Sequence, residues 1–167
     1  MMLGMSLQTF TLVHVFISLI GIGSGFVVMY GLLGRKPLDG ITAVFLVATV
    51  LTSVTGFMFP FEHLLPSHIV GALSLVILAI AIPARYVFHL SGLWRVVYVI
   101  GSAMALYLNI FVLIVQSFLK VPALHVMAPT QKEPPFLIAQ LSVLVLFVVL
   151  TIFATVRFHP EQVRTTA

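Results

Sequence analysis

The sequence has no cysteine and few charged residues. With cysteine absent from all 167 residues, disulfides, thiolate metal sites, iron–sulfur clusters and cysteine nucleophiles are excluded. Redox chemistry would therefore need a bound cofactor. Charged residues make up 7% of the chain and hydrophobic residues 61%, whereas soluble domains carry about 25% charged residues. No water-soluble fold could hide that much apolar surface, so we expect the lipid bilayer to be the solvent.

Familiar catalytic motifs are also absent from the sequence. It has no Gly-rich phosphate loop, no G-x-S-x-G, no H-E-x-x-H and no carboxylate pair spaced for acid–base chemistry. All four carboxylates fall in expected connections or in the tail, namely Asp39, Glu62, Glu133 and Glu161. Pumps and ion-coupled carriers place ionisable groups at membrane depth. We therefore expect neither an autonomous enzyme nor an ion-driven pump, unless a partner supplies the carboxylate.

Five apolar runs are long enough to cross a hydrocarbon core of about 30 Å. The expected spans are 9–33, 41–59, 67–88, 93–119 and 136–156. Proline, glycine and polar residues separate them, as expected where helices break. The sequence predicts an all-α integral membrane protein, a bundle of five transmembrane helices that forms a single transmembrane domain over residues 1–167.

Basic residues alternate between the connections. The first, third and C-terminal segments hold Arg35 and Lys36, Arg85 and Arg95, and Arg157 and Arg164, while the fourth holds only Lys120 and Lys132. Because Lys and Arg near helix ends stay on the cytoplasmic side, we expect the N-terminus outside and the C-terminus inside. Basic residues that occur singly or in pairs indicate topology and not a nucleic-acid surface.

Polar residues within the spans form stripes at helical spacing. His14, Ser18, Gly21 and Gly25 share one face of the first span, which predicts a packing face. Ser102, Asn109 and Gln116 recur every seven residues in the fourth span, and Thr49, Ser53 and Gly56 share a stripe of the second. In the expected orientation His14, Gln116 and Gln140 lie in the outer half of the bilayer, which predicts a polar pocket there.

Three interpretations of this polar half stay open. The simplest is hydrogen bonding between helices, which buried polar groups require in lipid. A second is a cofactor pocket, in which His14 and His68 ligate haem b, or in which one histidine with Asn109, Gln116 or Gln140 binds a quinone. A third is a metal site, which would take its ligands from Glu62, His63, His68 and His125.

Three segments resemble parts of small bacterial multi-span inner-membrane proteins that have no assigned activity. They are TSVTGFMFPF (52–61), LYLNIFVLIVQSFLKVPAL (106–124) and APTQKEPPFLIAQL (128–141). The resemblance covers most of the hydrophobic body. It implies a bacterial inner-membrane location and a small helical bundle, but no activity, substrate or catalytic residue.

The sequence favours a small non-catalytic membrane protein that acts as an accessory subunit. Its expected contacts are the lipid bilayer and either a membrane-protein partner or further copies of the same chain, since small-residue stripes suit lateral packing. The alternatives are an electron-transfer protein that holds haem b or a quinone, and a small-molecule carrier. A carrier is disfavoured because no midplane charge or pair of broken helices is evident.

Overall fold

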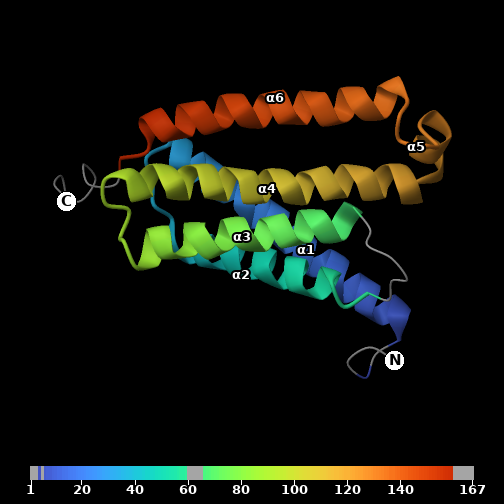
Figure 1. Ribbon diagram of the computed structural model, residues 1–167, viewed down its shortest axis with the longest axis horizontal. Coiled ribbons are helices and arrows are strands. Elements are labelled where there is room, and N and C mark those ends of the chain that lie inside the picture. The colour runs from blue at the N-terminus through green and yellow to red at the C-terminus, as the bar shows by residue number, and fades with distance from the viewer. Residues whose placement is uncertain (1–3, 5, 60–65, 160–167) are drawn as a thin grey trace.

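The computed structural model is an all-α bundle that describes Gly4, residues 6–59 and residues 66–159 (Figure 1). These residues are 83% helical and contain no strand. The helices are α1 (Leu7–Leu33), α2 (Asp39–Gly56), α3 (Pro66–Tyr86), α4 (Leu93–Lys120), α5 (Pro122–Met127) and α6 (Pro134–Arg157). All except α5 are long and apolar enough to cross a membrane. Five spans were predicted and five are found among the described residues.

The predicted ends of the spans agree closely with the observed ends. The largest difference is at the end of α2, predicted at Phe59 and observed at Gly56. The short helix α5 was not predicted. Its first residue is Pro122, and proline favours the first turn of a helix because its ring presets φ and its missing N–H has no partner there.

Helix α4 is the centre of the bundle. It packs against α1, α3, α5 and α6 and also contacts α2. Figure 1 shows α6 on one side of α4, α2 and α3 on the other, and α1 crossing the bundle from the α5 end to the far end of α6. The long helices alternate in direction along the chain, so Leu7 and Arg157 lie at opposite ends of the bundle.

Small residues let the helices approach closely. A Cβ added to Gly25 of α1 would lie 2.5 Å from Cδ1 of Leu106 and 2.9 Å from Cε2 of Phe45. A Cβ added to Gly101 of α4 would lie 2.8 Å from the methyl group of Ala81 on α3. Gly21 and Gly25 are both buried, which confirms that their stripe on α1 is a packing face.

Gly25→Ala should destabilise the bundle by about 1–3 kcal/mol, the usual cost of overpacking a tight interior. Phe45 and Leu106 are each 1% exposed, so neither side chain has free space into which to move. The measurement is thermal unfolding of the purified protein in detergent. Gly23→Ala is the control in the same helix, because a Cβ at Gly23 meets nothing within 4 Å. Equal stability of the two variants would contradict the assigned packing face.

Candidate functional site

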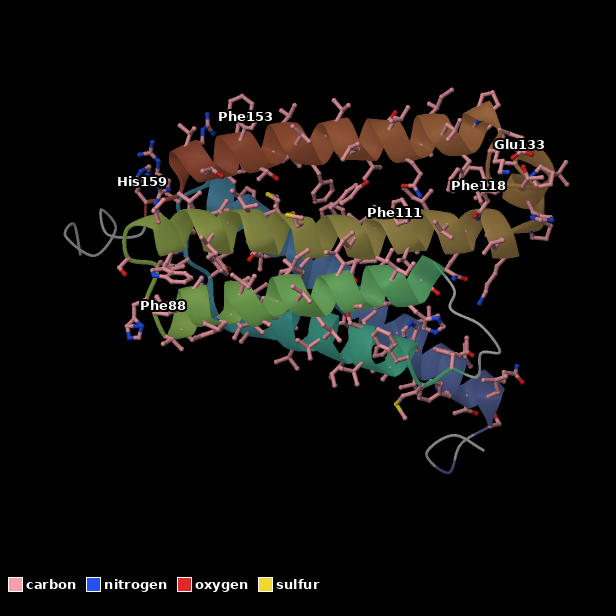
Figure 2. The ribbon with its side chains drawn as sticks, in the orientation of Figure 1. Phe88, Phe111, Phe118, Glu133, Phe153 and His159 are labelled. Atoms are coloured by element: carbon pink, nitrogen blue, oxygen red, sulfur yellow. The ribbon has the colours of Figure 1, made fainter. Side chains whose placement is uncertain are left out.

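The two ends of the bundle differ in composition. We call one the basic end: it combines the ends of α1, α3 and α6 with the starts of α2 and α4, and it carries Arg35, Lys36, Arg85, Arg95 and Arg157. We call the other the histidine end, and it carries His14, His68, His125, Lys120 and Lys132. Figure 2 shows His159 and Phe88 at the basic end and Glu133 and Phe118 at the histidine end.

His14 is held by a hydrogen bond to α2. Its Nδ1 lies 2.7 Å from Oγ1 of Thr55, and the Thr55 hydroxyl in turn donates to the carbonyl of Leu51 at 2.7 Å. When the hydroxyl hydrogen is directed at the Leu51 carbonyl, Oγ1 can accept a hydrogen bond from Nδ1–H. In that tautomer the lone pair is on Nε2, the nitrogen that would ligate iron or accept a hydrogen bond from a quinol.

Each of the two predicted cofactor histidines contacts a phenylalanine ring. The His14 ring meets Phe59 edge to face at 5.2 Å, and His68, which is 5% exposed, stacks on Phe57 at 5.7 Å. His14 contacts Thr55 in the last turn of α2, whereas His68 contacts Phe57 just after α2. Ligation of one haem by both histidines stays a prediction.

The predicted amide ligands are engaged with other helices. Asn109 of α4 donates to Oγ1 of Thr49 on α2 at 3.2 Å, and Thr49 donates to the carbonyl of Phe45 at 2.8 Å. Gln140 of α6 donates to the carbonyl of Phe111 on α4 at 3.3 Å, in the layer between these helices where Figure 2 shows Phe111. Gln116 is half-buried near the end of α4. Asn109 and Gln140 thus join helices, as the simplest interpretation expects.

The predicted metal site stays a prediction. Glu62 and His63 lie outside the described residues. Of the other two candidate ligands, His68 is stacked on Phe57, and the exposed His125 donates from Nδ1 to the carbonyl of Phe118 at 3.2 Å. Within the described parts of the chain, no three His, Asp or Glu side chains are grouped to hold a metal ion.

Two shallow grooves on the bundle are almost entirely apolar. One, of about 410 Å³, lies between α1 and α2 and is lined by Ile17, Ile20, Ala43, Val44, Val47, Ala48 and Leu51. The other, of about 230 Å³, lies between α4 and α6 and includes Tyr107, Phe147 and Thr151. Neither contains a predicted cofactor ligand. These surfaces suit acyl chains or apolar side chains of another helix.

Sequence reasoning missed the role of two arginines at the basic end. Arg85, in the last turn of α3, is 6% exposed. It donates to the Pro37 carbonyl at 2.9 Å and forms an ion pair with Asp39, the first residue of α2. Asp39 is also well placed for the positive end of the α2 dipole. Arg85 therefore fixes the connection between α1 and α2 to the end of α3.

Arg95 fixes the end of α6 to the start of α4. From the first turn of α4 it donates to the carbonyls of Thr155 and Phe158, at 2.8 and 2.5 Å. The last carbonyls of a helix lack partners within the helix and carry partial negative charge. A guanidinium group supplies both the donors and the opposite charge. The sequence did predict that the first, third and C-terminal segments lie on the same side of the membrane. That prediction brought Arg85 and Arg95 near the segments that they contact, and it was the only hint of these hydrogen bonds.

The connection before α6 is closed by Glu133. Its carboxylate accepts hydrogen bonds from the Thr130 hydroxyl at 2.8 Å and from the backbone N–H of Thr130 and Lys132 at 3.3 and 3.0 Å. Desolvation raises the pKa of the Glu133 carboxyl, but these hydrogen bonds together outweigh it, so the net pKa lies below its usual value. The ionised form of Glu133 therefore makes the hydrogen bonds that stabilise this turn.

Arg85→Met should lower the stability of the bundle by about 1–3 kcal/mol, since it removes hydrogen bonds from a charged donor to the Pro37 carbonyl and to Asp39. Arg35→Met is the matched control, because Arg35 is exposed at the same end of the bundle. Thermal unfolding in detergent measures both variants. An Arg85→Met variant as stable as Arg35→Met would show that the buried guanidinium does not hold the basic end together.

Comparison with protein-family models, with curated proteins and with solved structures gives no match. The length and hydropathy of five helices nevertheless support a multi-pass membrane protein. Its apolar helices imply contact with the lipid bilayer.

Proposed function

We propose that this chain is a small non-catalytic subunit of a bacterial inner membrane, which packs beside a larger membrane assembly. The observation that carries the proposal is the surface of α6, which buries the smallest share of its span among the five long helices. Large apolar side chains on it are exposed along the whole length, among them Leu141, Val145, Val149, Ile152 and Val156. The groove between α4 and α6 runs beside this surface and can receive side chains of a partner helix.

The use of polar side chains within the spans also favours a structural role. His14 joins α1 to α2, Asn109 joins α4 to α2, and Gln140 joins α6 to α4. Such bonds contribute about 0.6 kcal/mol each on average in membranes. These bonds hold the helices in one arrangement, so the bundle can present a fixed surface to a partner, as an accessory subunit requires.

We further propose that the basic end faces the cell interior. Among the described residues it carries Arg35, Lys36, Arg85, Arg95 and Arg157, against Lys120 and Lys132 at the histidine end. Retention of Lys and Arg on the cytoplasmic side then places the N-terminus outside and the C-terminus inside. In this orientation His14 and His68 lie in the outer half of the bilayer.

Electron transfer through a bound haem b or quinone is the second candidate. The contact between His14 and Thr55 supports it, because a hydrogen bond donated by Nδ1–H would leave the lone pair of Nε2 for iron or for a quinol hydroxyl. The absorption spectrum of the purified protein shows whether haem is bound. A Soret band that disappears in a His14→Ala variant would establish ligation by this histidine, and a colourless preparation would remove haem from consideration.

The main proposal predicts a stoichiometric partner. The tagged chain, extracted from its own membrane in a mild detergent, should purify with one larger membrane protein at a fixed ratio. Native mass spectrometry distinguishes such a partner from a second copy of the chain. A chain that purifies alone, or only as a homo-oligomer, would contradict the proposal.

A pair of variants tests which surface the partner occupies. Val145→Trp on α6 should abolish co-purification, because a bulky ring disturbs a packed helix interface. Phe16→Trp on α1 is the control, since Phe16 is 66% exposed and Val145 is 61% exposed. Loss of the partner in both variants or in neither would contradict the assignment of α6 as the docking helix.

A further inference from the structure

The groove between α4 and α6 holds a tyrosine at the depth of the bilayer centre. Tyr107 lines this groove, whose volume is about 230 Å³. It lies near the middle of α4, about 20 Å along the helix from both Leu93 and Lys120. Tyrosines of membrane helices are enriched at the two membrane–water interfaces, where the hydroxyl finds polar partners. At its own depth Tyr107 has no such surroundings in lipid.

The hydroxyl of Tyr107 makes no hydrogen bond within the described parts of the chain. Its ring lies 5.9 Å from the ring of Phe147 on α6 and 6.3 Å from that of Phe111 on α4, measured between centroids. The residue is half-buried, and its hydroxyl oxygen is not enclosed in the bundle as that of Tyr98 is. The ring is therefore packed by this chain, while the hydroxyl stays available to a group that enters the groove.

Lipid and water are poor partners for this hydroxyl. Acyl chains carry no acceptor, and the polar groups of lipids lie at the membrane surface, far beyond the reach of a side chain at this depth. A water molecule held by protein needs roughly two to four polar partners. Thr151 is the one other residue of the groove with a polar side chain, and its hydroxyl already donates to the carbonyl of Phe147 at 2.6 Å. These observations favour an acceptor that another protein brings into the membrane.

We infer that this groove receives one transmembrane helix of the partner protein and that Tyr107 donates a hydrogen bond to a polar side chain of that helix. The inference rests on the proposed function and adds the chemistry by which the partner is recognised. The backbone carbonyls of a spanning helix are engaged within it, so the acceptor is a side chain. Ala103 lines the groove at 1% exposure, and such a small residue lets the partner helix approach closely.

The acceptor on the partner helix is neutral. No charged residue or histidine lies in α4 between Arg95 and Lys120, or in α6 between Pro134 and Arg157. A carboxylate would therefore have no cation beside it, at a depth where an unpaired charge is costly. The amide of Asn or Gln and the hydroxyl of Ser or Thr accept a hydrogen bond without that cost. The occupant that fits is an apolar helix with one such residue near its centre.

Photo-cross-linking in the native membrane identifies the occupant of the groove. With p-benzoylphenylalanine in place of Met104, which lines the groove and is 41% exposed, we expect a covalent adduct with a larger membrane protein. The same group in place of Phe16, which is 66% exposed on α1, is the control and should give no such adduct. An adduct with a second copy of the chain, or with lipid alone, would overturn the inference.

Tyr107→Phe tests the hydrogen bond itself. The variant keeps the ring and loses only a hydroxyl that bonds to nothing in this chain, so its thermal unfolding should match that of the unaltered protein. The dissociation constant of the purified complex, measured by dilution in detergent, should rise about threefold, the average effect of a hydrogen bond between membrane helices. Tyr30→Phe is the matched control, since Tyr30 is 66% exposed on α1, and it should leave the constant unchanged.

The outcomes separate this inference from the proposed function. A complex that Val145→Trp abolishes but Tyr107→Phe leaves at full strength would overturn the hydrogen bond at Tyr107 and keep the accessory role. A tagged chain that purifies without any partner would contradict the accessory role itself.

Discussion

The bundle depends on two arginines, Arg85 and Arg95, that donate hydrogen bonds to backbone carbonyls at its basic end. Helix ends leave carbonyl groups without partners, and near hydrocarbon such groups are costly. Arg85 binds the Pro37 carbonyl and Asp39, and Arg95 binds the carbonyls that end α6. Through these contacts α3 holds the connection between α1 and α2, and α4 holds α6. In the orientation that we propose, the same two charges lie on the cytoplasmic side of the membrane.

Between its ends the bundle is held by close packing and by a small number of polar contacts. Lipid tails are as apolar as leucine, so burial alone gives little reason for helices to associate. Gly25 and Gly101 let backbones approach, and Asn109 and Gln140 add hydrogen bonds between helices. A bundle built in this way leaves α6 largely uncovered, and this surface is the one on which we propose that a partner protein packs.

The fold was predictable from the sequence because apolar runs of spanning length are interrupted by proline and glycine. Helix α5 was not predictable, since six residues between prolines carry too little pattern to identify a helix. The stripes through Gly21 and Gly25 and through Asn109 identified packing faces, but the partner Thr49 depends on how α2 and α4 are aligned. The hydrogen bond of His14 to Thr55 and the burial of Arg85 depend likewise on the relative placement of helices.

The orientation of the basic end is the central claim, and single-cysteine labelling tests it most directly because the chain has no cysteine of its own. Ser91→Cys, exposed between α3 and α4, and Ala123→Cys, exposed on α5, report on opposite ends of the bundle. With a membrane-impermeant maleimide added to sealed cells, Ala123→Cys should react, and Ser91→Cys should react only after permeabilisation. The reverse pattern would place the arginines outside and contradict the account.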